Sequence, residues 1–392
     1  MDLTVESAAV LLLVAAVVAM LARRLRLPYS VGLVAAGIVL AFLPVSTKFE
    51  LTKELLYTLL LPPLIFEAAF NIDWRHLRRD LIPIVTLATV GVVISAGVTA
   101  VGMHFFAGWP WMAAVIFGVL IAATDPVSVI ATFKQSGVRG RLLLLVESES
   151  LLNDGTAAVL LSVVLASTGV AWGLLVTIAG SILCGALIAG AALLLAGRTE
   201  DHLVEITLTT VAAYGSFLFA EHFQLSGVLA TLTAGLMMGN LVSISSRGRE
   251  AAQAFWEYAA FVSNSLVFLL IGVREARQDF RGVLWLAPLA ILLVTLARAA
   301  AVYPCCAIFQ WSRLRISAWH QHALVWGGLR GALALALALG LPAQVPEREA
   351  IITISFAVVA FSIFVQGLTM IPLLKKAGEL TATTHYEIAS ES

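Results

Sequence analysis

Leu151-Leu152-Asn153-Asp154-Gly155-Thr156 places a carboxylate in the middle of a long apolar run. A second carboxylate, Asp125, lies in an earlier apolar run, within Ala123-Thr124-Asp125-Pro126-Val127. An acid at the centre of a membrane helix costs roughly 2.5–3.5 kcal/mol on insertion scales. Because chains tolerate that cost where the acid binds something, we interpret the two acids as a site that holds a small cation or a proton. The two stretches therefore favour an ion transporter.

Composition places the chain in a membrane. Of its 392 residues, 60% are hydrophobic and only 12% are charged, and the mean hydropathy is +0.97. A soluble domain carries about 25% charged residues. The formal net charge is zero, so the composition gives no basic footprint for nucleic acid. We expect an all-α membrane protein with the lipid bilayer as its surroundings.

No cofactor is expected. The chain contains no Walker loop, no Rossmann glycine pattern and no zinc-ligand spacing. Its three cysteines, Cys184, Cys305 and Cys306, lie in apolar surroundings without the spacing of a disulfide framework. These absences favour a transporter over an enzyme.

Charged and turn-rich positions divide the chain into about thirteen apolar segments that are long enough to cross a bilayer. The first segment ends in Arg23-Arg24 rather than at a small-residue cleavage site, so we expect a retained helix and not a signal peptide. The predicted spans are 7–22, 28–44, 51–71, 81–106, 110–133, 142–168, 172–196, 203–220, 225–241, 254–273, 283–310, 318–341 and 350–373.

Lysine and arginine are distributed unevenly between the two ends of these spans. If the first loop is cytoplasmic, the cytoplasmic face holds sixteen of the 24 basic residues and the outer face holds six. This bias predicts an N-terminus outside and a C-terminus in the cytoplasm. The outer cluster Arg274, Arg277 and Arg281 is the exception, and it points to an error in the predicted helix end at residue 273.

Thirteen spans divide into two sets of six joined by one linker helix. We predict a transmembrane domain 1–376, with repeat one at 7–168, the linker at 172–196 and repeat two at 203–373. The second set then begins on the opposite side of the membrane, as in the inverted repeats of secondary transporters. The polar residues 377–392 are expected to form a short cytoplasmic tail.

The fifth and twelfth spans correspond in this division, and both contain helix breakers beside a charge. The fifth contains Thr124-Asp125-Pro126, and the twelfth contains Gly327-Gly328-Leu329-Arg330-Gly331. Pro126 has no backbone N–H and disfavours helical backbone at Asp125, which frees carbonyl groups. Two broken helices that cross at the midplane are the expected ion site of such folds. The alternative for an Asp before a Pro is an ordinary helix N-cap.

The sixth span presents two polar faces. At 100° per residue, Asp154, Ser150 and Glu147 fall within about 60° of one another. Glu149 and Asn153 share a different face, about 40° apart. The first face offers carboxylate and hydroxyl oxygens to a cation, and the second face needs a partner of its own.

A lone arginine inside the membrane must pair or reach the interface. Arg330 is the expected partner of Glu149, because glycines beside it allow a close helix approach. Arg298 is the second candidate for the same role. Glu67, inside the third span, is either a third carboxylate near the site or a gate. A structural pair with Arg298 or with a backbone group is the alternative for Glu67.

At these motifs the chain resembles the monovalent cation:proton antiporter family, which includes bacterial NhaP proteins and animal sodium/proton exchangers. The matching stretches follow the family order across nearly the whole chain. They are Leu61-Pro62-Pro63-Leu64-Ile65-Phe66-Glu67, Thr124-Asp125-Pro126-Val127, Glu149-Ser150-Leu151-Leu152-Asn153-Asp154, Gly327-Gly328-Leu329-Arg330-Gly331-Ala332 and Phe364-Val365-Gln366-Gly367.

The resemblance implies a specific ion site. Asp154 would be the main carboxylate for sodium and proton. Asp125, Ser150 and the Thr124 carbonyl would complete the sodium shell, with Glu67 nearby or linked through water.

The resemblance also implies roles for the second polar face. Glu149 and Arg330 would form a buried ion pair. Asn153 before Asp154, rather than a second aspartate, would go with electroneutral exchange of one cation for one proton. The fold would be a homodimer in the cell membrane, with one dimerisation bundle and one moving core bundle in each protomer.

We therefore expect an antiporter that exchanges sodium or lithium for protons in pH and sodium homeostasis. Potassium/proton exchange by the same fold is the alternative, because the ligand set does not separate these cations. An intramembrane aspartyl protease is disfavoured, since the Gly-x-Gly-Asp stretch common in such enzymes is absent. A channel or a sensor that does not transport is a further alternative, which would lack coupled exchange.

Overall fold

Helix is the only regular structure in the described residues, as the long apolar runs predict. The structure is a computed structural model. Pro126 and Val127 of the predicted site, and the predicted tail 377–392, lie outside the residues that it describes. The described residues are 5–25, 28–42, 52, 54–125, 129, 133, 140–166, 170–199, 201–241 and 245–376.

Each of the thirteen predicted spans contains helix. The elements of the first half are α1 (Val5–Leu25), α2 (Tyr29–Ala41), the π-helical η2 (Glu54–Leu60), α3 (Leu61–Asn71), α4 (Trp74–Leu77), α5 (Leu81–Thr86), the π-helical η3 (Leu87–Gly91), α6 (Val92–Ala107), α7 (Trp111–Ala122) and α9 (Arg141–Ala166). Those of the second half are α10 (Val170–Ala196), α11 (His202–His222), α12 (Gly227–Asn240), α13 (Ser246–Arg277), the 3-10 turn η4 (Arg281–Val283), α14 (Leu286–Ala307), α15 (Ala318–Trp326), α16 (Ala332–Leu339), α17 (Arg348–Phe361), the π-helical η5 (Ser362–Gln366) and α18 (Gly367–Lys376).

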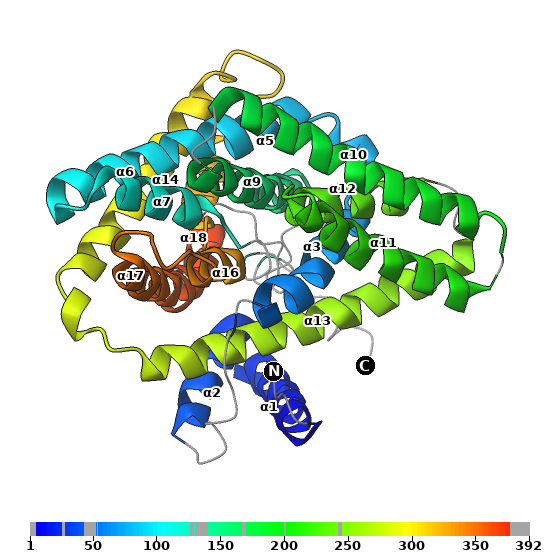
Figure 1. The fold of residues 1–392 in the computed structure, drawn as a ribbon, viewed down its shortest axis with the longest axis horizontal. Coiled ribbons are helices and arrows are strands. Elements are labelled where there is room, and N and C mark those ends of the chain that lie inside the picture. The colour runs from blue at the N-terminus through cyan, green and yellow to red at the C-terminus, as the bar shows by residue number, and fades with distance from the viewer. Residues whose placement is uncertain are drawn as a thin grey trace, which may run out of the picture.

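The helices form two groups (Figure 1). We name them the α13 bundle (α1–α3 and α10–α13) and the α14 bundle (α5–α7 and α14–α18). In the α13 bundle, α13 packs on α2 and α3, and α10, α11 and α12 pack on one another. In the α14 bundle, α14 packs on α6, α15 and α17. Helix α9 lies between the groups and contacts α7 of one and α10 and α12 of the other.

Length and composition make several of these helices able to cross a bilayer. Within the described residues, six helical stretches are long and apolar enough: Leu81–Ala107, Gly173–Ala196, His202–His222, Ser246–Arg277, Leu286–Ala307 and Arg348–Leu374. Several shorter helices, such as α2 and α12, are also apolar. The protein is therefore a multi-pass membrane protein, as predicted.

Small residues let α2 and α13 pack with their backbones in contact. A Cβ atom on Gly37 would lie 2.2 Å from the carbonyl oxygen of Leu269, and one on Gly272 would lie 2.2 Å from that of Val34. No larger residue fits at either position. Small residues play this part at helix interfaces in lipid, where burial of apolar surface gives no driving force.

The predicted helix end at residue 273 is wrong, because α13 continues to Arg277. Arg274 and Arg277 occupy the last turn of the helix, where cations interact favourably with the helix dipole. A charged residue does not by itself end a helix, so Arg274 does not mark the boundary.

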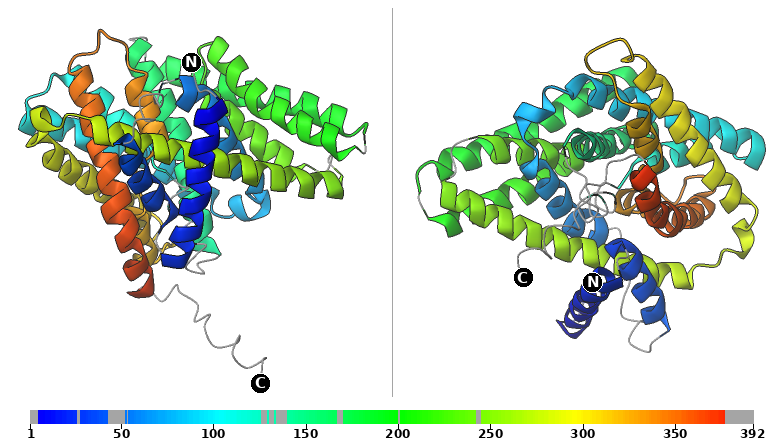
Figure 2. Two further views of the ribbon diagram at one scale, coloured as in Figure 1. Left: turned by 90° about the horizontal axis from the view of Figure 1, so that it is seen from below. Right: turned by 180° about the vertical axis from the view of Figure 1, so that it is seen from behind.

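The first helix begins and the last helix ends on opposite sides of the molecule. In the left view of Figure 2, α1 begins at the top and α18 ends at the bottom. This arrangement agrees with an odd number of membrane crossings. The division into two inverted repeats stays a prediction.

Candidate ion-binding site

The fifth span is unwound at the predicted position. Helix α7 ends at Ala122, Ala123–Asp125 are not helical, and Val129 and Phe133 are helical again. Ala123 has φ −56° and ψ 136°, an extended backbone that leaves the last carbonyl groups of α7 without helical partners. The local cause in the sequence is the proline at position 126, which disfavours helical backbone before it.

The twelfth span is also broken, and the two unwound segments cross. Helix α15 ends at Trp326 and α16 begins at Ala332, with a glycine-rich segment between them. At the crossing, the backbone N–H of Asp125 donates to the carbonyl oxygen of Leu329 over 2.7 Å. The prediction of two broken, crossing helices is confirmed.

Gly331 makes this crossing possible, because a Cβ atom there would lie 2.5 Å from the Cβ atom of Asp125.

We expect Gly331→Ala to push the two segments apart and to reduce cation-driven proton movement strongly. The overpacking should cost about 1–3 kcal/mol of stability. The measurements are exchange in vesicles and the melting temperature in detergent. In the control Gly190→Ala, where a Cβ atom meets nothing within 4 Å, both should stay near wild type. Wild-type exchange by Gly331→Ala would show that the crossing does not position the site.

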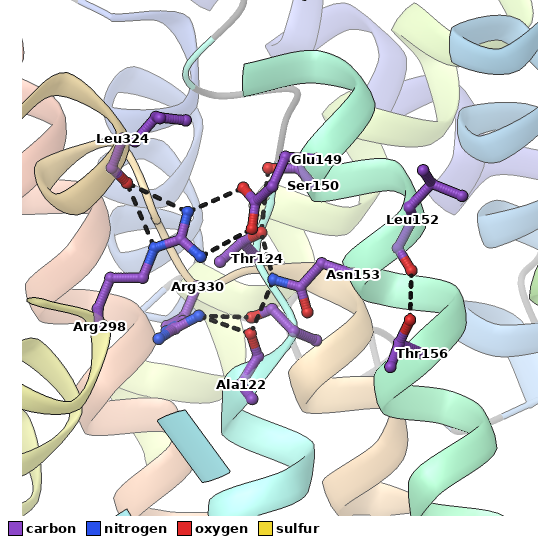
Figure 3. A network of polar contacts seen from close by, with 11 residues as sticks. Ala122, Thr124, Glu149, Ser150, Leu152, Asn153, Thr156, Arg298, Leu324 and Arg330 are labelled. Carbon is purple, nitrogen blue, oxygen red and sulfur yellow. Dashed lines mark hydrogen bonds and ion pairs between the residues drawn. The ribbon is translucent and has the colours of Figure 1, made fainter. Parts of the chain in front are cut away.

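Side chains of α9 bind the unwound segment of the fifth span (Figure 3). The side-chain amide of Asn153 donates to the carbonyl oxygen of Ala122 and to Oγ1 of Thr124, both over 3.1 Å. Thr124 in turn donates its hydroxyl to Oγ of Ser150 over 3.0 Å. All three side chains are buried. Asn153 and Ser150 thus hold the segment that carries Asp125 against α9.

Asp125 and Asp154 line one cavity of about 30 Å³. A cavity of this size has room for a water molecule or a small ion. Leu61, Leu64 and Ile65 of α3 form one wall, and residues 331–334 at the start of α16 form another. Because α3 belongs to the α13 bundle and α16 to the α14 bundle, the cavity lies between the two groups of helices.

One carboxylate oxygen of Asp154 is available to bind a cation or a proton. It is 6% exposed, and its Oδ1 atom is buried with no hydrogen-bond partner in the described part of the chain. The backbone N–H of Thr124 faces its carboxylate, and Asp125, Glu149 and Arg330 all act on it electrostatically. A second carboxylate in the same cavity and an unpaired buried oxygen suit this site to a bound cation or a proton.

The predicted ion pair between Glu149 and Arg330 is wrong. Glu149 pairs instead with the second candidate, Arg298, whose Nη1 and Nη2 atoms donate to the two carboxylate oxygens over 2.8 Å each (Figure 3). The Arg298 guanidinium also donates to the carbonyl oxygen of Leu324. Gly328 provides the space, since a Cβ atom there would lie 2.6 Å from Nε of Arg298.

Arg330 binds the backbone of the fifth span. Its Nη1 atom donates to the carbonyl oxygens of Ala122 over 2.8 Å and Ala123 over 3.2 Å. These are carbonyl groups that the unwinding leaves without helical partners. A guanidinium has five N–H donors and no acceptor, which suits it to this position. A membrane helix break needs donors nearby, and that requirement could have identified Arg330 from the sequence.

Two other predicted site residues are not among those that line the cavity. The hydroxyl oxygen of Ser150 accepts the hydrogen bond from Thr124 and does not line the cavity. Glu67 is half-buried on α3 and accepts a hydrogen bond from the side chain of Asn71 over 2.7 Å. Their roles in ion binding stay predictions. The apolar wall formed by α3 was not identified as part of the site, although Leu61 and Leu64 lie in a stretch that the resemblance matches.

Comparison with known proteins now identifies the family. The profile described as "Sodium/hydrogen exchanger, transmembrane" matches residues 10–376. The chain belongs to this family. It is a family of transporters and not of enzymes, as predicted, which sets the protease alternative aside.

Relatives of this exchanger support the assignment along most of its length. The Na(+)/H(+) antiporter ApNhaP of Aphanothece halophytica is 38% identical over 369 residues, covering 90% of this chain and 70% of that protein. The Na(+)/H(+) antiporter NhaG of Bacillus atrophaeus is 34% identical over 391 residues, covering 93% and 74%. The sodium proton antiporter MjNhaP1 of Methanocaldococcus jannaschii, solved at pH 8, superposes with a TM-score of 0.76 at 20% identity over 96% of both chains. The predicted antiporter fold is therefore confirmed.

Proposed function

We propose that this exchanger is an NhaP-type Na+/H+ antiporter in which Asp154 binds either a sodium ion or a proton. The observation that carries the proposal is the cavity between the two bundles, lined by the carboxylates of Asp125 and Asp154. The relatives named as Na(+)/H(+) antiporters support the same activity. Sodium and protons are the transported substrates, and no cofactor takes part in the proposed cycle.

Sodium would bind to oxygen atoms at the crossing. Carboxylates, carbonyl groups and hydroxyl groups are the ligands that hard cations prefer. Asp154 and Asp125 would supply charge, while the Thr124 carbonyl and the Ser150 hydroxyl would complete the shell. Glu67 would lie one step away, linked through water.

Exchange follows from competition for one site. With sodium or a proton bound, the charge of the site is reduced, and the α14 bundle can move past the α13 bundle. With the site empty, two uncompensated carboxylates would have to pass through a region of low dielectric constant, which is costly. Only the occupied states cross, so no separate proton path is needed.

Competition predicts a specific pH dependence. As the pH falls, protons occupy Asp154 and the apparent KM for sodium rises, while the rate at saturating sodium is unchanged. Initial rates in proteoliposomes with equal pH on both sides, over a series of sodium concentrations, measure both quantities. A rate at saturating sodium that falls with pH, at constant KM, would place the proton at another group.

Parallel runs with lithium and potassium would rank the cations, and a response to potassium alone would favour the potassium/proton alternative.

We further propose that exchange is electroneutral, as the family pattern of Asn153 before Asp154 implies. The structure supplies a compatible role for Asn153, whose amide holds the unwound segment rather than carrying charge. The expected result is that the rate in proteoliposomes does not change when valinomycin and a potassium gradient impose a membrane potential. A rate that rises with potential of one sign and falls with the other would mean that net charge crosses in each cycle.

The surroundings of the protein complete the proposal. We place it in the cell membrane with the N-terminus outside and the C-terminus in the cytoplasm, supported by the excess of basic residues on one face. We propose a homodimer, in which the α13 bundle forms the contact and the α14 bundle moves. The proposed role is control of pH and sodium.

A further inference from the structure

A second cavity, of about 360 Å³, lies beside α4 and the end of α12. It is lined by residues 73–75 from one side and by Leu236, Met237, Asn240 and Leu241 from the other. Asn240 joins the two sides, because its Oδ1 accepts from the backbone N–H of Trp74 and its Nδ2 donates to the carbonyl oxygen of Ile72, each over 2.8 Å. The cavity is therefore built by polar contacts between two elements.

One cation faces this cavity without a hydrogen-bond partner. In the part of the chain that the structure describes, the guanidinium of Arg75 makes no hydrogen bond. The nearby carboxylate of Asp73 has other hydrogen-bond partners. It accepts from the backbone N–H of Arg75 over 2.7 Å and lies 3.1 Å from Nδ1 of His76. Arg75 is thus the group available to a ligand, and an anion is what it would bind.

The floor of the same cavity is apolar. Leu236, Met237 and Leu241 form it, and Leu241 is 46% exposed. Trp74 at the rim is 42% exposed, as is usual for tryptophan at a membrane interface. An anion-binding group above an apolar floor fits an amphiphile better than a soluble anion.

Further basic residues surround this position. Arg249 of α13 donates to the carbonyl oxygen of Gly239, next to Asn240. Arg78 and Arg79 follow α4, and the charge distribution places all of them on the predicted cytoplasmic face. Clustered arginines beside a membrane attract anionic lipids.

We propose that this cavity binds an anionic phospholipid of the adjacent leaflet. Its phosphate lies on Arg75, and one acyl chain runs along Leu236, Met237 and Leu241. The bound lipid joins α12 to α4, which follows α3 in the chain. Because α3 carries Leu61, Leu64 and Ile65 into the ion cavity, the lipid steadies one wall of the exchange site.

The test is the melting temperature of the purified protein in neutral detergent as phosphatidylglycerol is titrated in. Phosphatidylglycerol should stabilise the wild type, and phosphatidylcholine should not. Arg75→Gln should weaken the apparent affinity for phosphatidylglycerol about fivefold, which corresponds to roughly 1 kcal/mol for one basic residue at a membrane surface. Arg313→Gln, an exposed arginine on the same predicted face and outside the cavity, should bind as the wild type does.

Two further arms test the lipid assignment itself. Met237→Glu puts a negative charge on the apolar floor and should weaken phosphatidylglycerol binding. If Met237→Glu does not fold, the affinity of Arg75→Gln for phosphatidylglycerol decides the proposal. Glycerol phosphate should not stabilise the wild type. Equal stabilisation by glycerol phosphate would mean a site for soluble anions, and equal phosphatidylglycerol binding by wild type and Arg75→Gln would place the lipid elsewhere. Either result overturns the proposal.

Discussion

Asp154→Asn is expected to abolish sodium-driven proton movement in everted membrane vesicles. An amide neither binds a proton in the physiological range nor carries the charge that attracts a sodium ion. The substitution preserves shape and replaces a buried carboxyl group whose Oδ1 has no hydrogen-bond partner in the described structure. We therefore expect the variant to fold, with a melting temperature at or above that of the wild type. Dequenching of a pH-sensitive dye after addition of a sodium salt measures the exchange.

The matched control is Asp279→Asn. Asp279 is exposed, accepts a hydrogen bond from the backbone N–H of Arg281, and is not among the residues that line the ion cavity. This variant should exchange as the wild type does. Normal exchange by Asp154→Asn would refute the role proposed for Asp154, and a loss of exchange supports that role only where the melting temperature is kept.

Glu149→Gln should destabilise the protein by about 3–5 kcal/mol, because it leaves the charge of Arg298 buried without its counter-charge. The side chain of Glu149 is 1% exposed and that of Arg298 is 7% exposed, so water cannot compensate. We expect a lower melting temperature in detergent and a lower yield from membranes. The apparent sodium affinity of the protein that does fold should stay near the wild-type value, since Glu149 does not line the ion cavity.

A surface pair and a double variant isolate this effect. Glu349→Gln breaks the ion pair with Arg348, in which the Glu349 side chain is 83% exposed, and it should leave the melting temperature almost unchanged. Adding Arg298→Gln to Glu149→Gln removes the lone charge and should recover part of the lost stability. A collapse of sodium affinity at an unchanged melting temperature would instead make Glu149 a cation ligand.

The position of the candidate site was predictable because its cause is local. An acid in an apolar run is costly wherever the run folds, so Asp125 and Asp154 stand out without any knowledge of the fold. The break at Asp125 is equally local, since the proline that follows disfavours helical backbone. The glycines around Arg330 predicted the matching break, and the two segments do meet through the hydrogen bond between Asp125 and Leu329.

The partners of the two buried arginines were not predictable in the same way. Arg298 and Arg330 are both lone cations in apolar spans, and helical periodicity says only which face of its own helix each occupies. Which of them reaches Glu149 depends on how α14, α15 and α9 pack. The absence of a Cβ atom at Gly328 lets Arg298 approach, while Arg330 lies beside the carbonyl groups that the break in the fifth span has freed.

The amino-acid order by itself determined that the chain crosses a membrane many times, where two of its helices break, and which acids lie in apolar runs at the candidate site. Each of these follows from the cost of placing a residue in lipid or in a helix, a cost that neighbours in the chain already set. Only the tertiary structure decided that Asp125 and Asp154 share one cavity with a wall from α3, and that Glu149 binds Arg298. Contacts between distant segments depend on the distances between packed helices, and a buried charge binds whichever partner that packing brings within reach.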